Sequence, residues 1–288
     1  MGAPEVLLSR LESELSGLNS VVTAFSGGVD STLVAVVADK VLKPKALAVT
    51  AVSPALSERE LSEAKLTASE FHLDHRIVRT NEMDQPGYTE NSPQRCYFCK
   101  NELYSQLHTL ARDEGYQWIV NGANKDDLGD YRPGLKAASE HQVRSPLVAA
   151  GFTKADVRAL ANYLGISGWD KPAQPCLSSR VPYGIPVNVT TLKMIERAED
   201  FLKDLGLNQV RARHHDRVCR IEVVPEEMEI IIVNREKITE YLKSLGYLWV
   251  SLDLAGLRSG SLNAQIGRDT GKSSGLVESS IYTINWRC

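Results

Sequence analysis

A glycine-rich loop between a short apolar run and a long apolar helix pattern is the feature that most constrains how this chain can fold. Residues 24–34 have the sequence AFSGGVDSTLV; the β-branched run SVVTAF precedes it at 20–25, and helix-compatible residues continue to 42. Because glycine has no Cβ, Gly27 and Gly28 allow backbone amides to approach an anion, and the N-terminus of the following helix offers further N–H groups. The sequence therefore predicts a strand–loop–helix unit that binds phosphate.

Apolar runs of strand length alternate with helix-like segments along the first part of the chain. Strands are expected at 20–25, 46–52, 75–80 and 117–122, and helices at 4–18, 31–42, 56–74, 99–115 and 153–165. The expected apolar face of the first helix comprises Val6, Leu7, Leu11, Leu15 and Leu18. The last of these helices begins with Thr153 as N-cap and Asp156 at its third position. This alternation predicts an α/β, Rossmann-like domain with a parallel sheet and ligands at the carboxyl ends of its strands.

The pattern changes after about residue 186. A helix is expected at 189–206, two alternating strands at 209–224 around a turn containing His214 and His215, a helix at 225–246 and a strand at 247–254. The Pro- and Gly-rich segment 180–186 is the expected junction. We therefore predict three parts: a larger α/β domain that carries the phosphate loop at 1–185, a smaller α+β domain for substrate binding or oligomerisation at 186–258, and a loosely ordered tail at 259–288.

Composition excludes several classes of protein. The chain has 288 residues, 43% of them hydrophobic, and a formal net charge of −3, so bulk electrostatics gives no reason to expect a nucleic-acid partner. No apolar run approaches the ~18 residues that a membrane helix needs. The N-terminus lacks a basic region followed by a long apolar stretch, so it is not a signal peptide. We expect a cytoplasmic protein, in which the cysteines are reduced, metal-bound or catalytic.

The loop itself carries the donors and the carboxylate that a nucleotide needs. Ser26 and Ser31 can donate hydroxyl hydrogen bonds to phosphate, and Asp30 is expected to bind a Mg²⁺ ion that bridges phosphates. The loop has no lysine, which excludes the G-x-x-x-x-G-K-[ST] phosphate loop. It matches the S-G-G-x-D-S loop of the N-type ATP pyrophosphatases, which cleave ATP to AMP and pyrophosphate while they adenylate a substrate. The alternative is a glycine turn that serves only strand–helix packing.

Three of the cysteines predict a second chemical centre. Cys96 and Cys99 form a C-x-x-C placed just ahead of the expected helix, a pattern that fits zinc, redox or cluster chemistry. No second C-x-x-C or pair of histidines accompanies it, which argues against structural zinc. With Cys176, three thiolates can hold a [4Fe–4S] cluster with one open iron; the alternative is three unrelated buried thiols. Cys219 is expected in a core, and Cys288 is terminal and incidental.

Several segments together resemble the LarE family, the ATP-dependent sulfur transferases of nickel-pincer nucleotide biosynthesis. The resemblance covers nearly the whole chain and is carried by AFSGGVDSTL, NGANKDDLGDYRPGLKAASE, TKADVRALA, WDKPAQPCLSSRVPYG, VRARHHDRVCRIEV and LDLAGLRSGSLN. It implies that ATP adenylates a carboxylate of pyridinium-3,5-biscarboxylic acid mononucleotide, and that delivered sulfur displaces AMP and leaves a thiocarboxylate. The product serves the nickel-pincer cofactor of lactate racemase.

The resemblance leaves two sulfur sources to consider. The better-known members take sulfur from a single cysteine at the position of Cys176, which becomes dehydroalanine. This sequence differs from them at Cys96 and Cys99. It resembles the branch in which three cysteines hold a [4Fe–4S] cluster that passes on sulfide, supplied as sulfide or by a sulfur donor.

The resemblance also implies a role for individual residues. Pyrophosphate and Mg²⁺ are assigned to Ser26, Gly27, Gly28, Asp30 and Ser31, and adenosine to Ala24, Thr50 and Gly122. Lys100 and Arg132 suit the charge that develops during adenylyl transfer, the alternative being surface solvation. The substrate's phosphate is assigned to Ser179, Arg211, Arg213 and Glu222, the alternative being a solvated sheet face. His214 and His215 are interpreted as turn residues.

Other functions remain open on the sequence. A tRNA thiolase would use the same loop and a three-cysteine cluster, although it would need a basic surface or an added RNA-binding domain. A non-catalytic carrier of iron–sulfur units is a second alternative. The family resemblance further implies a homo-oligomer, a hexamer, and no membrane or nucleic-acid partner.

Overall fold

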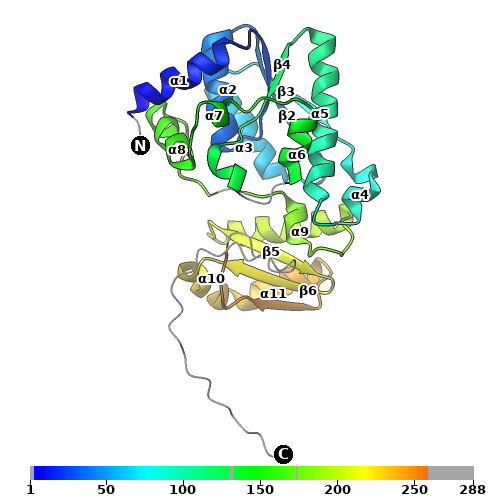
Figure 1. Cartoon of the computed structure of the whole chain (residues 1–288). Coiled ribbons are helices and arrows are strands. Elements are labelled where there is room, and N and C mark those ends of the chain that lie inside the picture. Colours follow the sequence, from blue (N-terminus) through cyan, green and yellow to red (C-terminus); the bar gives the residue numbers. More distant parts are fainter. Residues whose placement is uncertain (1–2, 130–132, 173, 259–288) are drawn as a thin grey trace, which may run out of the picture.

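Four parallel strands form the central sheet of the N-terminal part of the chain. In the computed structural model, which describes residues 3–129, 133–172 and 174–258, the strand order is β3-β2-β1-β4 (Figure 1). The strands are β1 (Val21–Ala24), β2 (Ala46–Val52), β3 (His75–Arg79) and β4 (Trp118–Val120). All three pairings are parallel. The predicted α/β class with a parallel sheet is confirmed.

The strand order determines where a ligand can bind. From β1 the chain moves outward to β2 and β3, and then returns to place β4 on the other side of β1. The connections after β1 and β4 therefore leave the same edge of the sheet in opposite directions. A parallel sheet opens a crevice at such a point, outside the carboxyl ends of its strands. The glycine-rich loop follows β1 directly, so it lies at this crevice.

Helices surround this sheet. The longer ones are α1 (Pro4–Ser16), α2 (Val29–Leu42), α3 (Glu58–Glu70), α5 (Arg95–Glu114), α6 (Pro133–Glu140) and α8 (Lys154–Tyr163). Shorter turns of helix are η1 (Glu82–Asp84), α4 (Pro86–Thr89), η2 (Lys125–Gly129), α7 (Pro146–Ala149) and η3 (Leu177–Arg180). The Thr153 and Asp156 capping box predicted for α8 is present, and Ser57 with Glu60 forms a second one at α3.

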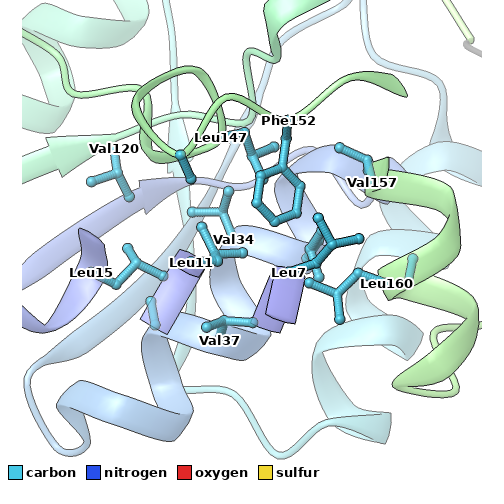
Figure 2. Packing of buried hydrophobic residues seen from close by; sticks show 14 of the residues in the cluster. Leu7, Leu11, Leu15, Val34, Val37, Val120, Leu147, Phe152, Val157 and Leu160 are labelled. Atoms are coloured by element: carbon cyan, nitrogen blue, oxygen red, sulfur yellow. The ribbon is translucent and has the colours of Figure 1, made fainter. Parts of the chain in front are cut away.

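The main core holds α1 and α8 against α2. Figure 2 shows side chains of these three helices pointing toward one another, with Leu147 and Phe152 beside them. Leu7, Leu11 and Leu15 of α1 are almost fully buried, and each such leucine contributes about 1.5–3 kcal/mol by leaving water. Val6 was expected on the same face but is 55% exposed. An α-helix turns about 100° per residue, which points Val6 roughly 140° away from the middle of the stripe that Leu7, Leu11 and Leu15 form.

The C-x-x-C motif lies inside a helix. Helix α5 begins at Arg95, so Cys96 and Cys99 occupy its first turns. The sequence pattern had instead placed the motif just ahead of the helix. Residues three apart on a helix lie on the same face. The two thiols therefore project from one side of the start of α5.

A second, smaller sheet follows η3. Helix α9 (Val189–Asp204) leads to β5 (Val210–His215), β6 (Val218–Val223), η4 (Pro225–Glu227), α10 (Met228–Val233), α11 (Arg235–Ser244) and β7 (Trp249–Leu252). The strand order is β5-β6-β7, with β5 antiparallel and β7 parallel to β6. One face of this sheet packs on the helices, with Cys219 in the core as expected.

Two predictions for this part are wrong. The segment 225–246 is not one helix, because Asn234 ends α10 by donating a side-chain hydrogen bond to the carbonyl of Ile230 at 2.8 Å. His214 and His215 belong to β5 and not to the turn, since they pair with Cys219 and Val218 in the ladder.

Ion pairs connect a helix beside the larger sheet to a helix beside the smaller sheet. Figure 1 shows α9 between the four-stranded sheet above and the three-stranded sheet below. Arg59 of α3 pairs with Asp200 and Asp204 of α9 at 3.0 and 2.9 Å. The domain boundary at 185 and 186 remains a prediction, and the predicted tail at 259–288 lies outside the described residues. Within residues 3–129, 133–172 and 174–258, no helix is long and apolar enough to cross a membrane.

Candidate active site

Hydrogen bonds among its own residues hold the glycine-rich loop in shape. The Ser31 hydroxyl donates to the carbonyl of Gly28 at 3.0 Å and accepts from the backbone N–H of Ser26 at 3.1 Å. The two serine hydroxyls lie 3.1 Å apart. Ser26 and Gly28 are exposed, so their polar groups face solvent where an anion would bind. The loop is therefore formed before any ligand arrives.

Two glycines of the site are required by close backbone contacts. Gly27 has a φ of 74°, and a Cβ there would lie 2.9 Å from Ala64 of α3. A Cβ on Gly122, after β4, would lie 2.6 Å from the backbone nitrogen of Ser31. Gly122 therefore brings the segment after β4 directly against the start of α2. The assignments of Gly122 and of Ala24, the last residue of β1, to adenosine remain predictions.

Asp30 has two partners that the sequence did not reveal. Its carboxylate forms an ion pair with the Lys154 ammonium group at the start of α8, and it accepts a hydrogen bond from the Asn124 side chain at 3.0 Å. The Lys154 and Asp30 side chains are 33% and 24% exposed, so solvent and ions can reach the pair. Of these three side chains, Asp30 offers the oxygens that a hard cation such as Mg²⁺ accepts, since the Asn124 amide oxygen accepts a hydrogen bond from the backbone N–H of Asp126 at 3.0 Å. From the sequence, Lys154 was expected only to lie at the start of the helix that follows Thr153.

Thr50 is buried beside the loop. Its hydroxyl donates to the carbonyl of Phe25 at 3.0 Å and lies 2.8 Å from Nε2 of His75. Burial lowers the pKa of His75, which favours the neutral imidazole in this contact. Because the Thr50 hydroxyl is engaged within the protein, any part that Thr50 plays in binding adenosine involves its backbone or methyl group.

The fold brings Cys176 to Cys96 and Cys99. Cys99 and Cys176 pack against the same apolar cluster, which contains Tyr88 and Leu177. Cys96 is exposed, while Cys99 and Cys176 are half-buried. Cys176 lies at the carboxyl edge of the four-stranded sheet, because the next residue, Leu177, donates its backbone N–H to the carbonyl of Ala55, just beyond β2, at 2.9 Å. The three sulfur-bearing residues thus lie on the side of the sheet where the phosphate loop opens.

The charges at these thiols act on one another. Burial raises the pKa of Cys99 to about 12. Burial also raises the pKa of Cys96, and a negative charge on Cys176 raises it further. Burial alone would lower the pKa of Lys100, but Tyr104 and all three cysteines raise it above its usual range. Lys100 therefore supplies positive charge where the sulfurs would carry negative charge, and its predicted role in adenylyl transfer remains a prediction.

A buried arginine binds the backbone of the Cys176 turn. Arg180 donates to the carbonyls of Cys176, at 3.1 Å, and of Pro175, and its guanidinium group also pairs with Glu199 at 2.7 Å. The Arg180 and Glu199 side chains are each 3% exposed. Burial alone would raise the pKa of Glu199, but the charge of Arg180 lowers it below the usual range, so this buried pair is ionised. It ties the turn to α9.

The face of the smaller sheet opposite its hydrophobic core carries the predicted phosphate-binding arginines. Arg213 donates twice to the Glu222 carboxylate, at 2.9 and 2.8 Å, and once to the carbonyl of Ser179 at 2.7 Å. Arg220 also donates to Glu222, at 3.0 Å. Burial, together with the nearby charges of Arg180 and Arg213, lowers the pKa of Arg211 to about 10. An anion beside Arg211 would relieve this concentration of positive charge.

The fit to a metal centre can be tested on the described side chains. Among residues 3–129, 133–172 and 174–258, no three His, Cys, Asp or Glu side chains group closely enough to hold a single ion. A [4Fe–4S] cluster places each thiolate on a different iron, so its ligands stand farther apart than those of one ion. The three thiols lie within electrostatic reach of one another and of Lys100, and their assignment to a cluster remains a prediction. Arg132, the second cation predicted near the reacting centre, lies outside the described residues.

The chain is similar to known proteins over nearly its whole length. Residues 5–93 match the asparagine synthase family model. The uncharacterized protein slr1717 of Synechocystis sp. is 46% identical over 90% of this chain and 97% of its own length. Pyridinium-3,5-bisthiocarboxylic acid mononucleotide synthase of Lactiplantibacillus plantarum is 38% identical over 88% of this chain and 93% of its own length. The chain belongs to the LarE family. A more distant relative is the uncharacterized protein MJ0830 of Methanocaldococcus jannaschii, 28% identical over 83% of this chain and 91% of its own length.

Membership of the LarE family explains the two halves of the site. The phosphate loop belongs to an ATP pyrophosphatase domain, and the chain is an ATP-dependent sulfur transferase. The loop would hold the phosphates of ATP, with Lys100 close to the thiols and Arg211 on the neighbouring sheet. Sequence reasoning missed Lys154, Asn124 and Arg180, whose partners come from distant segments.

Proposed function

We propose that the protein adenylates carboxylates of pyridinium-3,5-biscarboxylic acid mononucleotide with ATP and converts them to thiocarboxylates, as a step toward the nickel-pincer cofactor of lactate racemase. The observation that carries the proposal is the approach of Cys176 to Cys96 and Cys99 on the side of the sheet where the phosphate loop opens. An enzyme that only adenylates its substrate has no use for three thiols there. The substrate named in the L. plantarum relative supports the choice of acceptor.

Each residue group has a task in this reaction. Ser26, Gly28 and Ser31 would bind the pyrophosphate portion of ATP through their backbone and hydroxyl donors. Asp30 would hold the Mg²⁺ that neutralises the phosphates. Lys100 would stabilise negative charge as the carboxylate oxygen attacks the α-phosphorus and pyrophosphate leaves.

The substrate's own phosphate would bind at the face of the smaller sheet that carries Arg211 and Arg213. An anion beside Arg211 would stabilise its positive charge, because burial and the charges of Arg180 and Arg213 lower the pKa of Arg211 to about 10. Because Arg213 also touches the turn that carries Cys176, a nucleotide bound beside Arg211 would lie close to the sulfur centre. This arrangement supports one site that spans both sheets.

We further propose that Cys96, Cys99 and Cys176 hold a [4Fe–4S] cluster. The surrounding charges support this, since burial alone would lower the pKa values of Lys100 and Arg180 but the charge of Cys176, with others, raises both. When bound, the cluster would supply sulfide to the activated carbonyl carbon. The residues of the protein would shield that centre from water, through the apolar cluster against which Cys99 and Cys176 pack.

One anaerobic experiment tests this function. Protein loaded with iron and sulfide is incubated with ATP, Mg²⁺ and the pyridinium dicarboxylate mononucleotide, and pyrophosphate and the mass of the product are measured together. Pyrophosphate release that requires the mononucleotide, with oxygen replaced by sulfur in the product, is the expected result. Pyrophosphate release that instead requires tRNA would identify a tRNA thiolase. A preparation that binds iron and sulfide but releases no pyrophosphate with either acceptor would identify a carrier.

A further inference from the structure

Arg95 connects the two segments that carry the cysteines. It directly precedes Cys96 on α5, and its guanidinium group donates to the carbonyl of Ser178, two residues after Cys176, at 2.7 Å. Arg95 is 3% exposed, although arginine is rarely buried to this extent. One side chain therefore joins the start of α5 to the Cys176 turn across the interior of the protein.

Asn91 extends this connection. Its side-chain oxygen accepts a hydrogen bond from Arg95, and its side-chain nitrogen donates to the carbonyls of Pro182 at 2.7 Å and Ile185 at 2.9 Å. Asn91 is fully buried and has a φ of 55°, a left-handed conformation that asparagine tolerates. A residue just before α5 thereby holds the chain that follows Cys176 at several points.

A third contact closes the network. The Tyr88 hydroxyl and the Ser178 hydroxyl lie 2.6 Å apart, and both residues are fully buried. The backbone N–H of Val187 donates to the carbonyl of Thr89 at 2.8 Å. These bonds leave the Cys176 turn little freedom to move away from the segment that leads into α5.

The charge of Arg95 is directed toward the sulfurs. It donates to the neutral Asn91 side chain and Ser178 carbonyl, and it also forms a side-chain hydrogen bond with Cys96. A buried cation is costly unless its donors are satisfied and an anionic group can lie nearby. The Cys96 thiol is the group beside Arg95 that can take up this role.

We propose that Arg95 is a positioning residue, which holds the Cys176 turn against the start of α5 so that the three thiols face one site even in the metal-free protein. The inference rests on the proposed function only in identifying the three thiols as the sulfur centre. The contacts that carry it involve neither ATP, substrate nor iron.

The test measures how fast thiols are bridged in the metal-free, reduced full-length chain. Dibromobimane, which joins two neighbouring thiols, is added, and mass spectrometry of the digested protein identifies bridges from Cys176 to Cys96 or Cys99. We expect these bridges to form readily in the native chain and at least tenfold more slowly in Arg95→Gln. Arg95→Lys, which keeps the charge and one donor group, should give an intermediate rate.

Two controls separate positioning from general damage. Circular dichroism and ATP binding at the phosphate loop report whether each variant is folded. Arg10→Gln removes another arginine-to-carbonyl hydrogen bond, from α1 to Ala150, and should leave the bridging rate unchanged. The native bridging rate in a folded Arg95→Gln variant would overturn the proposal. If Arg95→Gln does not fold, a bridging rate in Arg95→Lys equal to that of the native chain would overturn the proposal instead. Because no substrate is used, failure here is distinct from failure of the sulfur-transfer assay.

Discussion

Lys154 and Asp30 form an ion pair that joins the start of α8 to the start of α2. The carboxylate that we propose as a Mg²⁺ ligand therefore also has a lysine as its partner. Asn124 donates a hydrogen bond to the other carboxylate oxygen at 3.0 Å. A Mg²⁺ ion bound to Asp30, as proposed, would compete with Lys154 for the same carboxylate. The loop lacks a lysine of its own, and the fold supplies one from a distant segment.

The first prediction follows from this pair. Asp30→Asn should abolish substrate-dependent pyrophosphate release, because an amide cannot provide the negative charge that holds Mg²⁺. Since the pair is partly exposed, its loss should lower the free energy of unfolding by less than about 1 kcal/mol. Both are measured on the same preparation, by a pyrophosphate assay and by urea unfolding.

A matched control lies on the same helix. Asp39 of α2 pairs with Lys43 at 3.1 Å, far along the helix from the loop. Asp39→Asn also removes one ion pair from α2 but should retain pyrophosphate release. Equal activity in Asp30→Asn and the native protein would remove Asp30 from the mechanism.

The second prediction separates the two arginines of β5. Arg211→Ala should weaken binding of the mononucleotide by about 1.5–3 kcal/mol, the scale of a charged hydrogen bond, and spare ATP binding. Arg213→Ala should instead lower the free energy of unfolding by about 3 kcal/mol, because it removes both hydrogen bonds that Arg213 donates to one carboxylate oxygen of Glu222, a side chain that is 1% exposed. Calorimetry and urea unfolding of both variants check this, and an equal loss of ATP affinity in Arg211→Ala would place the residue in the wrong site.

The sequence predicted the elements of the large sheet well. Strands buried on both faces are continuous apolar runs, and β2 occupies the predicted residues 46–52. The break between α10 and α11 was missed, because the apolar spacing continues across Asn234 and only a side-chain hydrogen bond interrupts the helix. The four-residue helices α4 and α7 were missed as well, since tertiary contacts and not periodicity hold such short turns.

The sequence identified the residues of the candidate site but not the contacts between residues from distant segments. Motifs identified the phosphate loop and the three cysteines, because each is defined by residue type and local spacing. The contact between Lys154 and Asp30 depends on how α8 packs against α2, which no local pattern encodes. The position of Arg95 beside Ser178 likewise depends on the packing of segments far apart in the chain.

The third prediction concerns stability against acid. Burial lowers the pKa values of four histidines: His75, His141, His214 and His215. Below their unfolded pKa of about 6.5 the unfolded chain binds more protons than the folded one, so the free energy of unfolding should fall as pH drops from about 6.5 toward 5. Glu60 acts in the opposite direction, because burial raises its pKa. Its effect is concentrated at the acidic end of this pH range, closer to the ordinary pKa of a carboxyl group.

Urea unfolding across this pH range measures the effect. In His75→Gln, which keeps a hydrogen-bond partner for Thr50, the loss of stability on acidification should be smaller than in the native protein. The exposed His72 provides the control variant His72→Gln. A stability that rises between about pH 6.5 and 5 would contradict the prediction.

The fourth prediction decides between the two sources of sulfur. If Cys96, Cys99 and Cys176 share a cluster, replacing any one of them with Ser should lower the iron and sulfide retained per chain, and the cluster should be sensitive to oxygen. Cys219→Ala is the matched control, because Cys219 is fully buried in the core of the smaller sheet. Iron and sulfide are measured in anaerobic preparations of all four variants.

The state of Cys176 after turnover completes this test. When the cluster delivers the sulfur, Cys176 keeps its own sulfur atom, and one chain can turn over more than once while sulfide is supplied. When Cys176 is the donor, its side chain loses the mass of one H₂S, becomes dehydroalanine, and each chain yields a single sulfur. We expect the first outcome, because Cys96 and Cys99 lie within electrostatic reach of Cys176 and would have no task in the second. Mass spectrometry of the peptide that contains residue 176, after turnover of anaerobic protein, distinguishes them. Dehydroalanine at this position, with full activity in Cys96→Ser and Cys99→Ser, would exclude the cluster.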